Sequence, residues 1–423
     1  MSWRETTLGE ITDLKRGFDL PKSQRLQGDV PVYSSSGITG SNSTAAVEGP
    51  CVITGRYGTI GEVFFSGGPC WPLNTALYST EFNGNNPRFI YYLLQTIPWQ
   101  GYTTASAVPG VNRNHVNLCP VKIPDRATQD AIVEVLDSIV DKIALNNRLN
   151  DYLSQICDAE FTDFVSNQRD ASWHDGTLNE LVEIRYGKDH KKLAEGPYPV
   201  YGSGGFMRSV EKPLSSGESV LIPRKGSLNN VMYVDEKFWT VDTMFFTIPL
   251  KPGAAKYVYQ YTKRLDFGTM NSGSAVPSMT TKILNSLVIP IPSDSALVSF
   301  NKKLQPFFDL FGKNEEENRR LVSLRDILLP KLMSGEIDVS KIDLTQLTNN
   351  HLAGRMHWSN VIRVRAIHAV HSQQSQIPAY ESVPKVSHSP CRTALTLGGI
   401  APLLSWLAVS QFTAQSFAML VVF

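Results

Sequence analysis

The glycine-rich stretch 55–61 is the part of this 423-residue chain that most resembles a chemical site. It reads Gly-Arg-Tyr-Gly-Thr-Ile-Gly, and closely spaced glycines allow a backbone to approach a phosphate. A phosphate-binding loop would end in Gly-Lys-Ser/Thr and begin a helix, whereas this stretch runs into the strand-like Val63. We therefore predict a strand, a loop and a second strand over 51–63, without nucleotide binding.

Other candidates for catalysis are equally weak. The stretch 86–89 reads Asn-Pro-Arg-Phe, close to the Asn-Pro-Pro-aromatic signature of amino-methyltransferases, but Arg88 replaces the second proline and no glycine motif for S-adenosylmethionine accompanies it. We expect it to be a turn that starts a helix. Five of the eight histidines lie beyond residue 350, and His115, His174 and His190 have no acid or cysteine at ligand spacing. The sequence predicts no catalytic residue, no metal site and a protein that binds.

Cations and polar side chains recur in loops about 168 residues apart, led by Arg56 and Arg224 at the tips of two predicted hairpins. An arginine fork donates two parallel hydrogen bonds and can read a guanine edge or grip a phosphate. One such residue alone is more often a solvated surface charge, but recurrence at matching positions favours DNA binding. Aromatic interleaving is absent, which favours duplex over single-stranded DNA. The candidate DNA-binding residues are Lys15, Arg16, Lys22, Arg25, Arg56, Tyr57, Thr59, Asn112, Arg113, Lys188, Lys191, Lys192, Arg224, Lys225 and Lys282.

An internal repeat explains this recurrence. The Pro-Val-Tyr at 31–33 returns at 199–201, Trp71 returns at Trp239, and the Ser-Ala-Val-Pro at 106–109 returns at 274–277. Short apolar runs separated by glycine, proline, asparagine and serine indicate short strands joined by tight turns in both copies. The framework is kept while the loops differ, as expected of one scaffold that binds two different ligands.

Each copy leads into a long amphipathic helix, predicted over 129–164 and 297–332. The apolar stripe of the first helix is Ile132, Leu136, Ile139, Ile143, Asn146, Asn150, Leu153 and Ile156, and adding 168 gives Phe300, Leu304, Phe307, Phe311, Asn314, Asn318, Leu321 and Leu324. Steps of three and four place each set on one face, as a coiled-coil seam requires.

Packed antiparallel, the two helices would bring Asn146 and Asn150 opposite Asn314 and Asn318. A polar layer inside an apolar seam costs stability but selects one register. The alternative is that these asparagines lie at the solvent edge of the stripe. Pro306 is expected to kink the second helix.

The predicted fold is therefore α+β: two repeated globular domains with small β-sheets, separated by two long antiparallel coiled-coil helices and related by a pseudo-two-fold axis. The predicted boundaries are 1–125 for the first globular copy, 126–168 for the central helix, 169–293 for the second copy, 294–339 for the second helix and 340–423 for a tail.

Composition limits the class of protein. The formal net charge of +1 does not indicate a nucleic-acid partner, so local patches must meet any anion. Five scattered cysteines argue against a disulfide scaffold and a structural zinc site, and they fit a reducing cytoplasm. The N-terminus has no apolar run of signal-peptide length, so we expect a cytoplasmic protein without membrane attachment.

The tail differs from the rest. Between 351 and 423 there are five Lys or Arg but only one acid, Glu381, and the apolar run 394–409 is shorter than a membrane-spanning helix prefers. We interpret this segment as a disordered or non-native extension.

Over residues 2 to 339 the chain resembles the specificity subunit of type I restriction-modification systems. The resemblance lies in the duplicated Trp-x(4)-Leu-x-Glu opening, the Pro-Val-Tyr-x-Ser turn, the Gly-Arg-x-Gly-Thr-Ile-Gly hairpin, Ser-Ala-Val-Pro, and above all the ending Leu-Arg-Asp-Ile-Leu-Leu-Pro-Lys-Leu-Met-Ser-Gly-Glu-Ile at 324–337. Copy two departs from the hairpin motif, since Pro-Arg-Lys-Gly-Ser-Leu-Asn at 223–229 keeps the cation and one glycine.

The resemblance implies that the two globular copies are target-recognition domains that read the halves of a bipartite, asymmetric duplex DNA site. It implies that the helices set the spacer and dock two adenine-methylating modification subunits, which bind S-adenosylmethionine. Restriction subunits that use ATP and Mg²⁺ would complete the complex, so this chain would bind no cofactor and catalyse nothing itself. The alternatives are a duplicated-sheet scaffold that binds carbohydrate or protein, and a fused methyltransferase.

Overall fold

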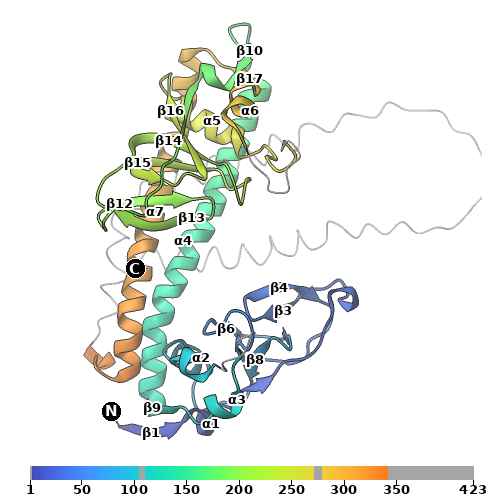
Figure 1. Ribbon diagram of the computed structural model, residues 1–423, viewed down its shortest axis with the longest axis vertical. Helices are drawn as coiled ribbons and strands as arrows, with labels where there is room; N and C mark the ends of the chain where they lie inside the picture. Colours follow the sequence, from blue (N-terminus) through green and yellow to red (C-terminus); the bar gives the residue numbers. More distant parts are fainter. Residues whose placement is uncertain (1, 104–109, 271–278, 342–423) are drawn as a thin grey trace, which may run out of the picture. The chain divides into compact units, whose positions relative to one another are not determined.

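The computed structural model describes residues 2–103, 110–270 and 279–341 (Figure 1). The two Ser-Ala-Val-Pro segments, at 106–109 and 274–277, and all but the first two residues of the predicted tail lie outside the described residues.

Copy one precedes the first long helix and consists of short strands and short helices. Its strands are β1 (Trp3–Thr7), β2 (Lys15–Arg16), β3 (Val30–Ser34), β4 (Gly37–Asn42), β5 (Cys51–Gly55), β6 (Val63–Ser66), β7 (Trp71–Pro72), β8 (Ala76–Ser79) and β9 (Pro120–Pro124). Its helices are α1 (Leu8–Ile11), α2 (Pro87–Gln95) and α3 (Arg113–Val116), with 3-10 turns at η1 (Lys22–Gln24) and η2 (Trp99–Tyr102).

Copy two lies between the long helices and repeats this order. Its strands are β10 (His174–Thr177), β11 (Val182–Tyr186), β12 (Tyr198–Gly202), β13 (Gly205–Val210), β14 (Ser215–Pro223), β15 (Met232–Thr240), β16 (Met244–Pro249) and β17 (Val288–Ile291). Its helices are η3 (Leu178–Glu180), α5 (Ala254–Thr262) and α6 (Thr281–Asn285), and η4 (Val339–Lys341) ends the described chain.

The sheets of the two copies have matching strand orders. In copy one, β2-β8-β5-β6 and β4-β3-β7 are separate sheets, whereas copy two joins the equivalent strands as β11-β16-β14-β15-β12-β13. The long strand β15 makes this joint, because it spans the positions of both β6 and β7. Copy one is interrupted there by Gly67-Gly68-Pro69, and proline has no N–H to continue a ladder.

The opening motif of each copy folds in the same way. The Glu10 carboxylate accepts a hydrogen bond from the Thr7 backbone N–H at 3.2 Å, and Glu180 does the same for Thr177 at 2.8 Å. The Leu-x-Glu spacing is therefore a capping box that ends the first strand and starts a helical turn. Those strands pair with the last strand of the same copy, as β1 with β9 and β10 with β17.

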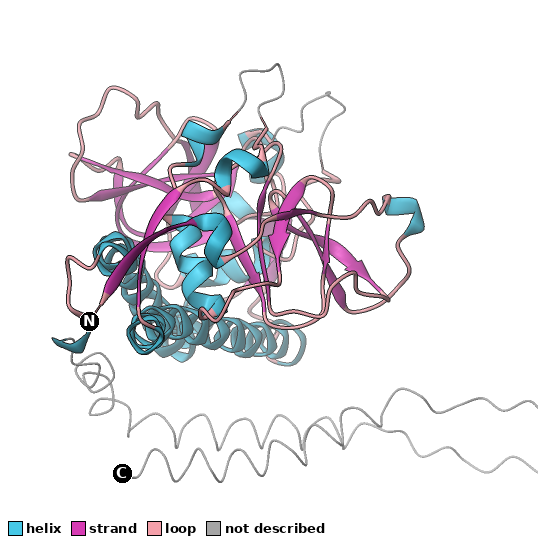
Figure 2. Ribbon diagram, turned by 90° about the horizontal axis from the view of Figure 1, so that it is seen from below, coloured by secondary structure: helices cyan, strands magenta, loops and turns pink. Residues whose placement is uncertain are grey.

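The long helices are α4 (Arg126–Asn167), with 42 residues, and α7 (Asp294–Ser334), with 41. Figure 2 shows them side by side, and their contacts run antiparallel, with Lys142 beside Glu317 and Glu160 beside Lys303. Both exceed the predicted bounds because Asp125 and Ser293 cap the first turns, and Gly335 ends α7 in the left-handed conformation. The predicted antiparallel helix pair is confirmed.

The core follows the antiparallel arrangement. One cluster joins copy one with Ile132 and Leu136 near the start of α4 and Leu332 near the end of α7. The other joins copy two with Phe161 near the end of α4 and Phe300 near the start of α7. Each globular copy is therefore packed on both long helices.

The predicted seam is wrong in part. Beyond Leu153 the buried positions of α4 are Cys157, Phe161 and Phe164, while Ile156 is only half-buried. Of the two adjacent rings at 307 and 308 in α7, Phe308 is buried and Phe307 is only half-buried. These helix ends pack on copy two as well as on each other: the Phe161 ring lies 5.5 Å from Tyr257, and the Phe308 ring lies 4.6 Å from Tyr233.

Three further expectations concern local structure. Helix α7 continues through Pro306, although that residue cannot donate the usual hydrogen bond to the preceding turn. The stretch 86–89 starts α2 as expected, since the Asn86 side chain accepts from the backbone N–H of Arg88 at 2.8 Å. Lys15 and Arg16 were expected to lie in a loop with the other candidate cations, but these two residues form β2 and pair with Tyr78 and Leu77.

Among the described residues, no helix is both long and apolar enough to span a bilayer.

Candidate nucleic-acid interface

The loop after β5 is held to the sheet through its backbone. The N–H groups of Arg56 and Tyr57 both donate to the Thr75 carbonyl, at 2.9 and 3.2 Å, and the Arg56 carbonyl accepts from Val111 at 2.9 Å. Gly58 then turns the chain with φ at 78°, a conformation that favours glycine. The side chain of Arg56 is therefore carried on a fixed backbone.

The loop after β14 in copy two is held by the same three hydrogen bonds. The N–H groups of Arg224 and Lys225 donate to the Thr243 carbonyl, at 2.8 and 3.3 Å, and the Arg224 carbonyl accepts from Met279 at 2.9 Å. Gly226 has φ at 84°. Each of these residues lies 168 positions after its counterpart in copy one, so the two tips are structurally equivalent.

In copy one the predicted residues converge on a pocket of about 680 Å³. Strand β2, the loop after β5 and the start of α3 supply its walls. Six candidates line it: Lys15, Arg16, Arg56, Tyr57, Asn112 and Arg113. Leu77, Tyr78, Gly110, Val111 and Asn114 complete the lining and were not among the predicted residues. The pocket therefore joins residues from four separate parts of the sequence, since Leu77 and Tyr78 belong to β8.

The charges of this pocket are only partly compensated. Lys15 pairs with Glu81, whose hydrogen bond raises the pKa of the lysine, and Arg16 lies 3.6 Å from Asp19. Arg56 and Arg113 have no carboxylate within 4.0 Å among the residues that the structure describes. A pocket with two unpaired guanidinium groups can bind an anion such as a phosphate.

The other candidates of copy one lie elsewhere or have structural roles. Lys22 is exposed on η1, and Arg25 donates to the Thr39 carbonyl at 2.9 Å, which ties its loop to β4. Thr59 does not line the pocket. Its carbonyl occupies the space that a side chain at position 55 would need, which accounts for Gly55. Asn112 lines the pocket and also caps α3, accepting from the Asn114 N–H at 3.0 Å.

In copy two the candidates are arranged around Arg224. Its guanidinium carbon lies 5.4 Å from the centre of the Tyr186 ring, and one of its nitrogens donates to the Asp242 carbonyl at 3.4 Å. The Tyr186 hydroxyl lies 3.4 Å from the Thr281 hydroxyl, next to the exposed Lys282 on α6. Tyr186 and Thr281 were missed by sequence reasoning, although the repeat aligns them with Arg16 and Arg113.

The lysine-rich segment of copy two lies beside β15. The Lys188 N–H donates to the Thr240 carbonyl at 2.9 Å, and its carbonyl accepts from the Trp239 indole at 2.8 Å. The side chains of Lys188, Lys191 and Lys192 are exposed, and within the described part of the chain none has a carboxylate within 4.0 Å. The same holds for Lys225 and Lys282.

The four predicted asparagines meet at the middle of the helix pair. Asn146 donates to Asn318 at 2.9 Å, and Asn314 donates to Asn150 at 2.7 Å. Asn146 and Asn314 are buried, so they do not lie at a solvent edge. Their role in selecting the register stays a prediction.

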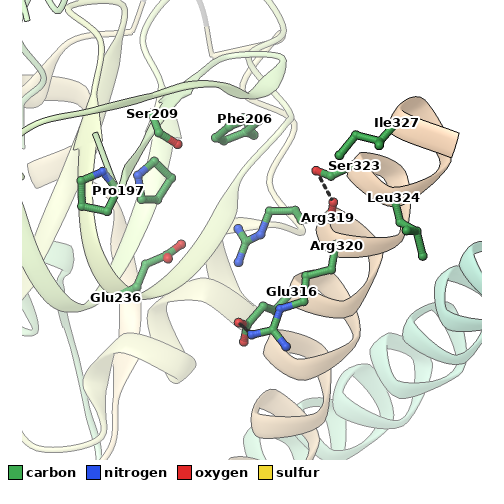
Figure 3. A pocket seen from close by; sticks show the side chains of 11 residues that line it. Pro197, Phe206, Ser209, Glu236, Glu316, Arg319, Arg320, Ser323, Leu324 and Ile327 are labelled. Carbon is green, nitrogen blue, oxygen red and sulfur yellow. Dashed lines mark hydrogen bonds and ion pairs between the residues drawn. The ribbon is translucent and has the colours of Figure 1, made fainter. Parts of the chain in front are cut away.

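A second pocket, of about 730 Å³, lies between copy two and α7 (Figure 3). Arg319 reaches from the helix toward the strands, and Glu236 extends from β15. Glu236 accepts a hydrogen bond from the Tyr201 hydroxyl at 2.6 Å. None of the predicted DNA-binding residues lines this pocket. The described ranges also hold no group of three His, Cys, Asp or Glu side chains placed to bind a metal ion.

Comparison with known proteins identifies the family. The family model described as "Type I restriction modification DNA specificity domain" matches twice, over residues 1–155 and 171–322. The HindI type I restriction enzyme specificity subunit of Haemophilus influenzae is 32% identical over 134 residues, which are 31% of this chain and 25% of that protein. A Mycoplasma pneumoniae protein named as a type I specificity subunit is 23% identical, over 78% of this chain and 96% of its own length.

A solved structure supports the same fold. The crystal structure of a type I restriction-modification system S subunit from M. genitalium has a TM-score of 0.55 and 18% sequence identity, covering 78% of this chain and 96% of that one. Its fold agrees with the two copies and the paired long helices found in this chain. With both copies matched by the family model, the chain belongs to the type I restriction-modification DNA specificity family.

Proposed function

We propose that this chain reads a bipartite, asymmetric site in duplex DNA and directs adenine methyltransferase and restriction subunits to it. The equivalence of the two hairpin tips carries the proposal. Each tip is fixed by the same backbone hydrogen bonds and presents an arginine without a carboxylate partner among the described residues. Two tips on one framework, surrounded by different side chains, suit two different half-sites.

The surrounding cations have the distribution expected of a phosphate-binding surface. Arg113, Lys188, Lys191, Lys225 and Lys282 are exposed in both copies and have no described ion pair. Phosphate contacts give affinity and orientation, while contacts to base edges give sequence discrimination. A net charge of +1 does not contradict this, because the cations without an ion pair lie in loops and on the short helices α3 and α6 of the described chain.

A partly exposed apolar stripe on α4, in which Leu149 and Ile156 are half-buried, supports the partner assignment. Leu145, Leu149, Tyr152 and Ile156 follow at steps of four, three and four, so they share one face of the helix. Leu145 is 48% exposed and Tyr152 is 51% exposed. Apolar side chains so exposed along one helix face favour a protein partner. We assign this α4 stripe to the modification subunits.

The chemistry would belong to the partners. Two modification subunits would bind S-adenosylmethionine, restriction subunits would use ATP and Mg²⁺, and this chain would act in the cytoplasm without catalysing a reaction itself.

Binding to duplex DNA across a salt series tests this function, with the full chain alone and with its modification subunit. We expect the logarithm of affinity to fall linearly with the logarithm of salt concentration, and Arg113→Ala to reduce the slope by about 1. Lys302→Ala, an exposed lysine on α7, serves as the control and should leave the slope unchanged. Absent or salt-independent binding in both settings would contradict the proposal and favour a carbohydrate- or protein-binding scaffold.

A further inference from the structure

Three positions around each hairpin tip are equivalent in the two copies. Arg16 pairs with Leu77 in β2-β8, and Tyr186 pairs with Phe245 in β11-β16, so position 16 corresponds to 186. Positions 56 and 57 correspond to 224 and 225 through their shared hydrogen bonds to Thr75 and Thr243. Read in this order, the triplet is Arg, Arg, Tyr in copy one and Tyr, Arg, Lys in copy two.

The central arginine lies over a tyrosine ring in both copies, but the tyrosine comes from a different position. In copy one the guanidinium carbon of Arg56 is 4.5 Å from the centre of the Tyr57 ring, the next residue in the loop. In copy two Arg224 is 5.4 Å from the ring of Tyr186, which lies on strand β11, two strands away from β14 in the sheet. Tyrosine and the second cation have therefore exchanged places between the copies.

A tyrosine beneath a guanidinium group orients it without using its hydrogen-bonding edge. The ring attracts the cation through its π face, and the in-plane N–H groups stay available for a ligand, apart from the Arg224 nitrogen that donates to the Asp242 carbonyl. The rings are partly exposed, Tyr57 at 38% and Tyr186 at 48%, so they lie at the surface where DNA would approach. An ion pair with a carboxylate would instead occupy the fork.

The exchange moves the second cation. In copy one it is Arg16, on strand β2, and it lies 3.6 Å from Asp19. In copy two it is Lys225, in the hairpin loop, and it is exposed. Both copies thus keep the arginine and the tyrosine ring next to it. The neighbouring positive charge comes from strand β2 in copy one and from the hairpin loop in copy two.

We propose that Arg56 and Arg224 each read a guanine edge, that Tyr57 and Tyr186 are their positioning residues, and that the exchanged cations Arg16 and Lys225 bind phosphates on different sides of the reader. This inference rests on the proposed function. It explains how one framework can read two different half-sites, because a shifted phosphate contact changes how the same arginine enters the groove.

Replacement of Arg56 or Arg224 by lysine in the complete complex tests whether these arginines recognise guanine. The measurement is a map of methylated adenines across a genome. Lysine keeps the charge but lacks the fork, so Arg56→Lys should weaken discrimination at a guanine of one half-site by about tenfold or more. Arg224→Lys should do the same at the other half-site alone. Arg4→Lys and Arg169→Lys are matched controls away from the two hairpin tips and should change neither half-site.

The tyrosines are tested by pairs of variants. Tyr57→Phe and Tyr186→Phe keep the ring and should keep discrimination, whereas Tyr57→Leu and Tyr186→Leu should weaken it at the same guanine as the arginine variant. A merely structural role would lower assembly or thermal stability without changing which base is preferred. Equal discrimination by the Phe and Leu variants would overturn the positioning role.

An exchange variant tests the cations. Arg16→Tyr combined with Tyr57→Lys gives copy one the arrangement of copy two. We expect Arg56 to keep its guanine while the phosphates whose ethylation interferes with binding shift at that half-site only. An unchanged interference pattern would overturn the phosphate assignment.

The two proposals fail differently. If the wild-type complex methylates no bipartite site, the proposed function is wrong. If it methylates a bipartite site and both arginine variants leave the two half-sites unchanged, only this inference is wrong.

Discussion

The Nζ atom of Lys142 on α4 lies 3.1 Å from Oε2 of Glu317 on α7. In the internal repeat, neither residue aligns with a charged residue of the other helix. The residues 168 positions away are Leu310 and Leu149. Asn146 joins the pair, accepting from Lys142 at 3.1 Å and donating to Glu317 at 2.8 Å. If two α4 helices paired in this register, Lys142 would face Leu149. The ion pair therefore favours the pairing of α4 with α7 over the pairing of two identical helices.

We therefore expect Lys142 and Glu317 to be energetically coupled. Lys142→Leu and Glu317→Leu should each destabilise the chain by about 1–2 kcal/mol, because each leaves one partner of a half-buried, hydrogen-bonded pair. The double variant should lose less than the sum, with a coupling of about 1 kcal/mol in urea unfolding. Simple additivity would show that the two side chains do not stabilise the pairing together.

Asp137 fastens copy one to α4. It accepts from Nε of Arg88 at 3.1 Å and from the Tyr92 hydroxyl at 2.5 Å, and Tyr92 is almost fully buried. Asp137→Asn should cost roughly 2 kcal/mol of unfolding free energy, because it leaves a guanidinium and a buried hydroxyl poorly paired. Asp141→Asn, one turn further along the same helix and exposed, should cost almost nothing. Equal unfolding midpoints for both variants would contradict this role.

The first turn of α4 should give a pH-dependent contribution to stability. The Thr128 backbone N–H donates to Asp125 at 3.0 Å and, with the Thr128 hydroxyl, holds the pKa of Asp125 below its ordinary value of 3.8. A lowered folded-state pKa means that this stabilisation is complete above the ordinary value and is lost as pH falls through the folded-state pKa.

Asp125→Asn keeps a capping side chain but removes the charge. The thermal midpoint of the wild type should exceed that of the variant by a constant margin from about pH 7 to about pH 4, and the margin should shrink below that. The other carboxylates titrate in both proteins, so they cancel in the comparison. A margin that persists unchanged to about pH 2 would show that the charge of Asp125 does not stabilise the helix.

Much of the fold could be predicted because the repeat supplies its own comparison. Trp71 and Trp239 are 168 residues apart, and both pair in parallel with the valine of a Pro-Val-Tyr motif, Val32 or Val200. The asparagine layer could also be predicted, because a polar interruption repeated in two apolar stripes identifies residues that face each other. Periodicity could not show that Phe308 is buried instead of Phe307, because the rings of copy two, not the partner helix, decide that burial.

Individual residues of the candidate site could be predicted from the sequence, but their arrangement in space could not. The sequence indicated Arg56 and Arg224, yet it gave no sign that Lys15 and Arg113 would share a pocket, since strand pairing brings them together. Tyr186 was missed because an exposed tyrosine is unremarkable until β11 is aligned with β2. Its signal was present in the repeat as a tyrosine in the place of Arg16.

The length of the helix pair should set the spacer between the half-sites. Removing about one turn, roughly four residues, from α4 between Leu136 and Asn146 shortens the pair by about 6 Å, or about two base pairs of duplex. The facing turn of α7, between Asn318 and Leu329, must be removed as well, so that the asparagine layer and both cores keep their partners. Genome-wide mapping of methylated adenines by the complete system should then show both half-sites unchanged and a shorter spacer. A deletion in α4 alone serves as the control: it breaks the pairing of Asn146 with Asn318 and should reduce methylation at every spacing. An unchanged spacer in the doubly shortened chain would mean that the helices do not measure the distance along DNA.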